Sequence, residues 1–432
     1  MKVLLVGSGA REHALAWKLS HSKLVSDLFY WPGAPAMKAC GQKFPSKGDS
    51  WQDLTDSAKA EGVDFVVVGP EQPLAEGFAD LCQKAGIPVF GPQQAAAQLE
   101  SSKEFAKNIM RQADIPTAAY HVVDNFSDCQ NVAINMIAET GGAVIKASGL
   151  AAGKGVFVCT SEADVASGID RLKSSMAQAA ERIVVEEVLE GRECSFFCFI
   201  GKNKATPLGF AVDFKRLQDG DVGPNTGGMG CYTPVPWLPE DASNRVMGQV
   251  VEPLIAEMAK QDMEYTGCLY VGLMWGANGP SVVEFNVRLG DPEAQVLAVN
   301  DKRDWGEIIA DKLGFDVPGF DANKGQAGDR HSVAVVMAGE GYPYEKPKEK
   351  VSPFKEQLFA NEGSDTAVFG ASVLKENDQL LPGGGRVLTV VQTAADFQTA
   401  REEAYERVKE ISQTWPKVQF RNDIALRVTN EV

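Results

Sequence analysis

The chain has 432 residues, of which 44% are hydrophobic and 23% are charged, and its formal net charge is −16. This length suits about three domains, and the acidic balance argues against a nucleic-acid or anionic-membrane surface as the main partner, so any phosphate must be held by locally arranged basic groups. The eight cysteines contain no Cys-x-x-Cys pair. Without an apolar run of ~18 residues or a signal-peptide pattern, the sequence predicts a cytoplasmic protein.

The first residues predict the opening of a Rossmann-like unit. Residues 2–7 are an apolar run typical of a buried parallel strand, and the Gly-Ser-Gly-Ala-Arg-Glu stretch at 7–12 leads into a helix. Glu12 stands where a dinucleotide fingerprint has its third glycine, and the predicted second strand at 28–31 is not closed by an acidic residue. The stretch is therefore only a weak indication of a nicotinamide cofactor.

A second unit follows, with a predicted parallel strand at 63–68 and the loop Gly69-Pro70-Glu71 at its carboxyl end. Ligands bind at the carboxyl ends of parallel strands, so Glu71 is a candidate site residue. The alternative is an acidic residue that merely stabilises a helix N-terminus.

A lysine-bearing helix and a glycine-rich hairpin follow. Residues 99–110 predict a helix with Lys103 and Lys107 on one face, a pattern that on its own is usually a solvated surface. Strands at 143–147, which carries Lys146, and at 156–160 then flank the loop 148–155. Backbone amides and an ammonium group in such a loop can close on phosphate. It is not a Walker A loop, because a glycine replaces the metal-binding Ser or Thr and a strand follows.

The next segments suit a nucleotide and a small ligand. A strand at 183–189 is followed by Glu193. Free backbone groups at the end of this strand can hold an adenine, and the carboxylate can hold ribose hydroxyls. Residues 220–230 contain five glycines in eleven positions, which predicts a mobile loop whose backbone approaches a ligand closely.

The strand at 282–288 is the strongest candidate for a metal site. Its alternation predicts that Val283, Phe285 and Val287 face a core, whereas Val282, Glu284, Asn286 and Arg288 face the other way. Two oxygen donors two residues apart suit Mg²⁺, and the guanidinium beside them can hold an anion. The alternative is a half-exposed strand with a polar outer face.

The composition changes near residue 325. A β-rich run at 331–337, a glycine turn before Arg386, a strand at 387–391 and an amphipathic helix at 394–411 predict a small α+β domain without a catalytic constellation of its own. Arg386 could close over a ligand.

Taken together, this order of motifs resembles the ATP-grasp superfamily and, within it, the glycinamide ribonucleotide synthetase family. The resemblance covers nearly the whole chain and is most specific at residues 223–230 and 288–295. It implies an α/β fold with a Rossmann-like N-terminal domain (1–102), an ATP-grasp domain (103–325) with a mobile lid (about 120–190), and a small α+β C-terminal domain (326–432).

The resemblance also implies a reaction, in which ATP, with Mg²⁺ or Mn²⁺, drives the ligation of glycine to 5-phosphoribosylamine through an acyl phosphate. The expected partners are these small molecules, not nucleic acid or membrane, and a monomer is favoured over an oligomer. The residues that it assigns to ATP are Lys107, Lys146, Gly153, Lys154, Gly155, Glu186, Glu187, Leu189 and Glu193. Those assigned to the metal are Glu284 and Asn286. The catalytic set is Arg288, Asp291, Asp213 and Lys215. The substrate-binding set is Glu71, Asn225, Gly227, Gly228 and Met229.

The sequence departs from the family pattern in four places. Ser148 and Phe214 stand where the family usually has Asp and His, and residues 34–37 and 370–373 differ from the family's motifs. Three alternatives therefore stay open. They are another ATP-grasp carboxylate–amine ligase of purine synthesis, a non-catalytic nucleotide-binding relative, and an NAD-dependent oxidoreductase that rests only on Gly7 and Gly9.

Overall fold

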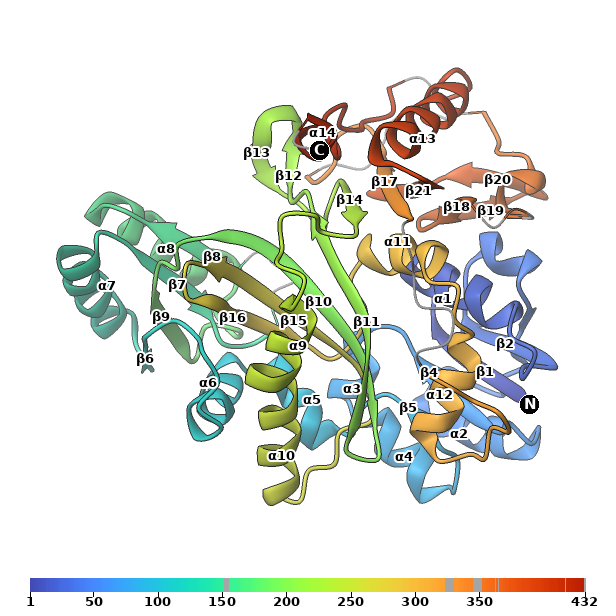
Figure 1. Cartoon of the computed structure of the whole chain (residues 1–432), viewed down its shortest axis with the longest axis horizontal. Helices are drawn as coiled ribbons and strands as arrows, with labels where there is room; N and C mark the ends of the chain where they lie inside the picture. Colours follow the sequence, from blue (N-terminus) through green and yellow to red (C-terminus); the bar gives the residue numbers. More distant parts are fainter. Residues whose placement is uncertain are drawn as a thin grey trace.

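A computed structural model describes residues 1–150, 155–322, 330–344, 352–361, 363, 365–415 and 417–430. Figure 1 shows the N-terminal residues (blue) and the C-terminal residues (orange to red) on one side of a set of long central strands, and a separate lid (teal) on the other side. No helix among the described residues is long and apolar enough to cross a bilayer.

The N-terminal domain is a parallel sheet with strand order β3-β2-β1-β4-β5. Its strands are β1 (Lys2–Gly7), β2 (Asp27–Pro32), β3 (Gln42–Lys43), β4 (Phe65–Val68) and β5 (Val89–Phe90). Its helices are α1 (Ala10–Ser20), η1 (Pro35–Ala39), α2 (Trp51–Ala60), α3 (Glu71–Ala75), α4 (Phe78–Lys84) and α5 (Gln94–Ser101). The strand order reverses between β1 and β4, so their carboxyl ends form the edge where such sheets bind ligands.

The lid has a sheet and a core of its own. Its elements are β6 (Tyr120–Val123), α7 (Phe126–Thr140), β7 (Ala143–Ala147), β8 (Val156–Cys159), α8 (Glu162–Ser175) and β9 (Ile183–Glu187). The sheet order is β6-β9-β7-β8. Apolar side chains of α7 and α8 pack on this sheet in a cluster that holds Cys129, Ile145 and Val165. The predicted glycine–lysine hairpin is β7–β8, which pairs from Ala143 with Cys159 to Lys146 with Val156.

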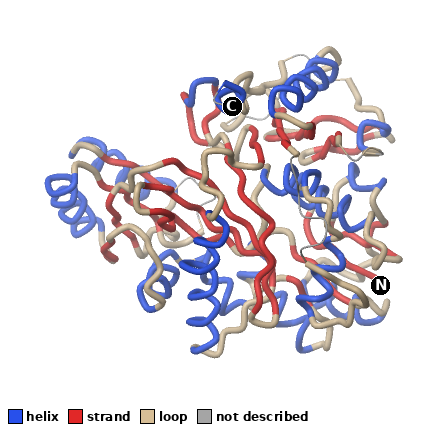
Figure 2. Tube along the Cα trace, in the orientation of Figure 1, coloured by secondary structure: helices blue, strands red, loops and turns tan. Residues whose placement is uncertain are grey.

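One sheet joins the ATP-grasp core to the C-terminal domain, with strand order β16-β15-β10-β11-β14-β17-β21-β18. The core strands are β10 (Arg192–Gly201), β11 (Lys204–Asp213), β14 (Gly230–Thr233), β15 (Gly267–Gly276) and β16 (Gly279–Asn286). The C-terminal strands are β17 (His331–Ala338), β18 (Thr366–Gly370) and β21 (Arg386–Ala394). Figure 2 shows the long strands at the centre, with lid helices on one side and N-terminal helices on the other.

The remaining elements cover this sheet or project from it. They are α6 (Lys103–Gln112), β12 (Arg216–Gln218), η2 (Asp219–Asp221), β13 (Val222–Asn225), α9 (Ala242–Val246), η3 (Met247–Val251), α10 (Glu252–Lys260), α11 (Glu293–Asn300), α12 (Trp305–Leu313), η4 (Glu356–Phe359), β19 (Val373–Glu376), β20 (Gln379–Pro382), α13 (Phe397–Ser412) and α14 (Leu426–Asn430). One buried cluster takes side chains from all three domains, including Leu5, Phe199 and Phe369. The lid is therefore the separate unit, and the other domains share a core.

A predicted helix and a predicted strand differ in detail from the structure. The helix expected over 99–110 is two helices, because Ser102 leaves the helical conformation and its hydroxyl accepts a hydrogen bond from Phe105 N to cap α6. The strand alternation at 282–288 is interrupted by a bulge, since Gly272 pairs with Glu284 and Leu273 with Val282. Val282 therefore joins Phe285 and Val287 in the core, and Val283 does not.

Candidate active site

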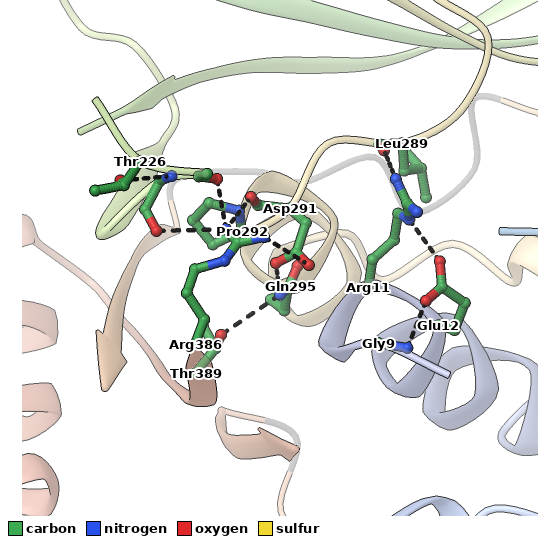
Figure 3. A network of polar contacts seen from close by, with 12 residues as sticks. Gly9, Arg11, Glu12, Thr226, Leu289, Asp291, Pro292, Gln295, Arg386 and Thr389 are labelled. Atoms are coloured by element: carbon green, nitrogen blue, oxygen red, sulfur yellow. Dashed lines mark hydrogen bonds and ion pairs between the residues drawn. The ribbon is translucent and has the colours of Figure 1, made fainter. Parts of the chain in front are cut away.

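The glycine turn after β1 is filled by the carboxylate of Glu12. This carboxylate accepts hydrogen bonds from Gly9 N at 2.7 Å and from Arg11 Nε at 2.5 Å (Figure 3). A Cβ atom added at Gly69 would lie 2.3 Å from the Cγ atom of Glu12. An anionic side chain thus occupies the space that a dinucleotide pyrophosphate would need, which argues against the oxidoreductase alternative.

Arg288 follows β16 and lies between two carboxylates of the N-terminal region. Its Nε lies 3.2 Å from Glu71 Oε2, and its Nη2 lies 2.7 Å from Glu100 Oε1. Although burial lowers the pKa of Arg288, these two carboxylates raise it above its ordinary value, so the guanidinium stays charged. Burial raises the pKa of Glu71, but Arg288 and Arg11 outweigh it and the pKa is lowered.

Glu100 was not among the residues predicted from the sequence. It also accepts a hydrogen bond from Val287 N at 2.8 Å, so one carboxylate fixes both the strand end and the guanidinium. Burial raises its pKa. The clue in the sequence was an acidic residue beside the apolar run of α5, where Ala96, Ala97 and Leu99 are buried. An acid on a buried helical face needs a partner.

The predicted metal ligands lie next to each other on β16. Asn286 Nδ2 lies 3.4 Å from Glu284 Oε1, and Asn286 Oδ1 accepts a hydrogen bond from Arg288 Nη2 at 3.0 Å. Burial raises the pKa of Glu284, but nearby lysines, Lys215 first, outweigh it and the pKa is lowered. Within the described part of the chain, no group of three His, Cys, Asp or Glu side chains could hold a metal ion. A carboxylate and an amide fit a Mg²⁺ ion that takes its other ligands from phosphate and water.

Two lysines and one glutamate form a buried cluster between α6 and the lid. Glu186 Oε2 lies 2.7 Å from Lys146 Nζ, and Glu186 Oε1 lies 3.3 Å from Lys107 Nζ. Burial lowers the pKa of Lys107 to about 8, against the opposing effect of Glu186. Lys146 Nζ also donates to Val283 O at 3.2 Å, which ties the lid strand β7 to β16. The Glu186 carboxylate therefore faces the two lysines predicted to hold phosphate.

Three other residues predicted to bind ATP lie on or beside the lid strands β8 and β9. Glu187 accepts a hydrogen bond from Ala119 N at 2.9 Å, and Leu189 is half-buried just after β9. Gly155 is buried, and its carbonyl accepts a hydrogen bond from Ala147 N. Gly153 and Lys154 lie outside the described residues.

Asp213 and Lys215 lie where β11 ends, beside Glu193. The Lys215 ammonium pairs with the Glu193 carboxylate. Burial raises the pKa of Asp213 against the opposing effect of Lys215. Burial lowers the pKa of Lys215, but the carboxylates of Asp213 and Glu193 together outweigh it, and the pKa is raised well above its ordinary value. Glu284 on β16 also raises the pKa of both Asp213 and Lys215.

Asp291 is held from two sides. Its Oδ1 accepts a hydrogen bond from Gln295 Nε2 at 2.7 Å, and its Oδ2 lies 3.1 Å from Arg386 Nη2. Figure 3 shows the guanidinium of Arg386 between Asp291 and the glycine loop. Its Nη1 donates to the carbonyls of Gly227 and Gly228. The arginine expected to close over a ligand thus closes over the loop itself.

The predicted substrate loop differs along its length. Asn225 is exposed at the end of β13, and Gly227 is exposed beside Arg386. Met229 is fully buried, with its amide donating to Phe214 O and its carbonyl accepting from Val336 N. Its side chain supports the loop from inside the core. Residues 220–225, expected as part of a mobile loop, instead belong to η2 and to β13, which pairs with β12.

The four departures from the family pattern are packed into the fold. Ser148 Oγ accepts a hydrogen bond from Glu104 N at 3.1 Å, at the start of α6. Ala34 and Met37 are buried, and Gly370 N donates to His13 Nδ1 at 2.9 Å. The ring of Phe214 lies against the Arg421 guanidinium. The charged side chains around Arg288, Glu186 and Lys215 described above are all present despite these four departures.

A Rossmann-like domain, a four-stranded lid and an antiparallel sheet with an acidic–amide pair flanked by lysines define an ATP-grasp ligase. The models of the phosphoribosylglycinamide synthetase N domain, ATP-grasp (A) domain and C domain match residues 1–100, 101–294 and 332–427. The chain belongs to the phosphoribosylglycinamide synthetase family.

Known proteins are similar over the full length. The phosphoribosylamine–glycine ligases of Rhizobium meliloti (strain 1021) and Mesorhizobium japonicum are 39% and 40% identical, over 99% and 98% of this chain and 98% and 97% of theirs. A crystal structure of the ligase from Thermotoga maritima superposes with a TM-score of 0.80 at 29% identity, covering 98% of this chain and 100% of that one. The biotin carboxylase–βγ-ATP complex of Campylobacter jejuni shares the fold, with a TM-score of 0.68 at 15% identity, covering 97% and 91%.

Proposed function

We propose that this protein ligates glycine to 5-phosphoribosylamine with the cleavage of ATP to ADP and phosphate, giving glycinamide ribonucleotide. The observation that carries the proposal is the gathering of cations around Glu284 in a chain whose net charge is −16. Lys146 Nζ donates to Val283 O on one side of Glu284, and Arg288 donates to Asn286 Oδ1 on the other. Although burial raises the pKa of the Glu284 carboxyl, Lys215, Lys103 and Lys146 outweigh it and lower the pKa. Such a concentration of positive charge suits phosphoryl transfer, where protein groups neutralise charge on the transferred group.

The residues divide the work by position. We assign Lys107 and Lys146 to the nucleotide phosphates, because both ammonium groups lie against Glu186 and that of Lys146 also reaches Val283 on β16. Arg288, held by Glu71 and Glu100, presents a fixed guanidinium to the carboxylate or acyl phosphate of glycine. Mg²⁺ bound at Glu284 and Asn286 would supply further neutralisation of phosphate charge.

The attacking amine must lose a proton when it forms the amide bond. Asp213, whose pKa burial raises, lies beside Lys215 and is our candidate to accept that proton. Glu71 faces phosphoribosylamine from the N-terminal domain, and residues 225–228 complete the acceptor side. The lid hairpin excludes water, which would otherwise hydrolyse the acyl phosphate.

One assay tests this proposal against the alternatives. Purified protein, MgATP, glycine and freshly generated phosphoribosylamine should give ADP, phosphate and glycinamide ribonucleotide, and omission of either acceptor should nearly stop ADP release. AMP and pyrophosphate as products would contradict the acyl-phosphate route. Binding of MgATP without turnover would favour a non-catalytic relative, and turnover with a different carboxylate or amine would favour another ligase.

A further inference from the structure

The C-terminal domain contacts the segment that carries Lys215. Lys215 lies between β11 and β12, and the chain returns along β13 to residue 230. Phe214 N donates to Gly230 O, Met229 N donates to Phe214 O, and Thr226 N donates to Lys215 O. Residues 214–230 are therefore a closed loop, and a shift of its base moves the residues on either side of it.

Arg421 reaches this base from the end of the C-terminal domain. It is 1% exposed, and its Cζ lies 4.8 Å from the centre of the Phe214 ring. Its Nη1 donates to Arg216 O at 3.2 Å and to Asp221 Oδ1 at 2.8 Å. Its Nε and Nη2 donate to the two oxygens of Asp423, each at 2.7 Å. One guanidinium thus contacts both the ring at the base of the loop and the hairpin beyond it.

The two residues after Arg421 also bond to the turn η2. Asn422 N donates to Asp219 Oδ1 at 2.7 Å, and Gly220 N donates to Asp423 Oδ2 at 2.8 Å. The C-terminal segment 421–423 and the turn η2 therefore bond in both directions. At the other end of the loop, Arg386 bonds Gly227 and Gly228, as described above.

The contact with Phe214 has a consequence for its neighbours in sequence. Side chains alternate along an extended chain, so Asp213 and Lys215 point away from the face on which Phe214 meets Arg421. An arginine fork that makes several hydrogen bonds and stacks on a ring fixes position more closely than a lysine does. Arg421 thus contacts Phe214, the residue between the two predicted catalytic residues.

We propose that Arg421 is a positioning residue, which sets Asp213 and Lys215 for the acceptor step by fixing the base of the loop 214–230. The inference rests on the proposed function, because it takes those two residues to serve the acceptors. A merely structural role for Arg421 predicts something else, namely lower stability with unchanged kinetics in the folded fraction.

The test compares Arg421→Lys and Arg421→Met with Arg427→Met as the matched control. Arg427 comes from the same segment and pairs with Asp221 at 3.4 Å, but its side chain is 74% exposed. We expect the Arg421 variants to lose roughly 10- to 100-fold in kcat/KM for glycine and phosphoribosylamine, since a displacement of ~1 Å in an active site can cost about 100-fold. The KM for ATP should stay near the wild-type value, because Lys107 and Lys146 are untouched. Unchanged acceptor kinetics in folded Arg421→Lys would overturn the proposal.

A milder variant guards against loss of folding. Asp221→Asn removes the carboxylate that pairs with Arg421 and Arg427, on a side chain that is 42% exposed, and should shift acceptor kinetics in the same direction but less. Hydrogen–deuterium exchange provides a readout that needs no turnover. Amides of residues 219–230 should exchange faster in Asp221→Asn and Arg421→Lys than in the wild type, with the lid amides of β6 and β9 unchanged. If residues 219–230 exchange equally fast in the variants and the wild type, the proposal is overturned even if the ligase reaction is confirmed. If the variants exchange faster but the wild-type protein has no ligase activity, only the proposed function is refuted.

Discussion

At the scale of a single residue, the predicted role of Glu284 as a metal ligand can be tested by removing its charge. Glu284→Gln keeps the shape of the side chain but removes an anionic oxygen. Its loss should cost about 2–4 kcal/mol of transition-state stabilisation, a figure typical of one electrostatic group in an active site. Turnover should then fall roughly 30- to 1000-fold. The measurement is the steady-state rate at several Mg²⁺ concentrations.

Asn286→Ala is the companion variant. It removes a neutral ligand, so its rate should fall less, and added Mg²⁺ should partly restore both variants. Normal turnover of Glu284→Gln at sub-millimolar Mg²⁺ would place the metal elsewhere.

Glu100 gives a second prediction at this scale. Glu100→Gln leaves Arg288 with Glu71 as its carboxylate partner, so we expect the free energy of unfolding to fall by roughly 1–3 kcal/mol. Glu104→Gln is the matched control, since Glu104 pairs with Arg182 at 2.6 Å but the side chains are 29% and 46% exposed. That change should cost under about 1 kcal/mol. Urea denaturation measures both free energies of unfolding. Equal losses would show that the buried pair of Glu100 contributes no more to stability than the exposed pair of Glu104.

Helix α1 carries a prediction about pH at the scale of an element. Its His13 is buried between Phe359 and Phe369, its Nδ1 accepts from Gly370 N, and burial lowers the pKa of the imidazole to about 3. An unfolded histidine titrates near pH ~6.5. Below that pH the unfolded state binds a proton that the folded state does not, so stability falls as the pH drops towards 3.

The expected loss between pH 6.5 and 5 is about 2 kcal/mol, at ~1.4 kcal/mol per pH unit. His13→Gln should lack this loss, whereas His21→Gln, an exposed histidine just after the same helix, should keep it. Urea denaturation of the three proteins at pH 7 and pH 5 measures the difference. If the wild type and His13→Gln lose equal stability, the buried imidazole does not govern the pH dependence.

The elements also show what a sequence can and cannot predict. Periodicity and glycine spacing predicted β1, β7, β8, β16 and α13, because these follow from local alternation and turn residues. The phase of β16 was not predictable, since the bulge depends on its pairing with β15. Glu100 and Arg421 were missed for a related reason, because each acts on a partner over 180 residues away in the sequence. The family resemblance supplied the roles that spacing alone left open.

At the scale of the whole molecule, the lid should behave as a separate unit of stability. Its core is a cluster of its own, whereas the N-terminal domain, the rest of the ATP-grasp domain and the C-terminal domain share buried residues. Small cores open more readily than large ones. We therefore expect amides in β6, β7 and β9 to exchange faster than those in β1 and β4, and saturating MgATP to slow the lid amides selectively. Lid and β1 amides that exchange at one common rate would contradict this.

Ligand-induced stabilisation gives a further prediction at this scale. A ligand that binds only the folded state raises the melting temperature in proportion to the logarithm of its concentration. MgATP should do so, and NAD should not, because Glu12 fills the glycine turn after β1. An increase with NAD equal to that with MgATP would reopen the oxidoreductase alternative.

The separate core of the lid has a consequence for how such enzymes diversify. A substitution in the core shared by three domains needs matching changes in each of them. We therefore expect the residues of this shared core to change slowly, and in a correlated way, among related enzymes. The lid can instead be inherited, exchanged or redesigned as a cassette, provided that Lys146 and Glu186 keep their places at the junction with α6 and β16. A chimera that takes residues 120–187 from a related ligase should therefore fold, and any new preference among nucleotides should travel with the cassette.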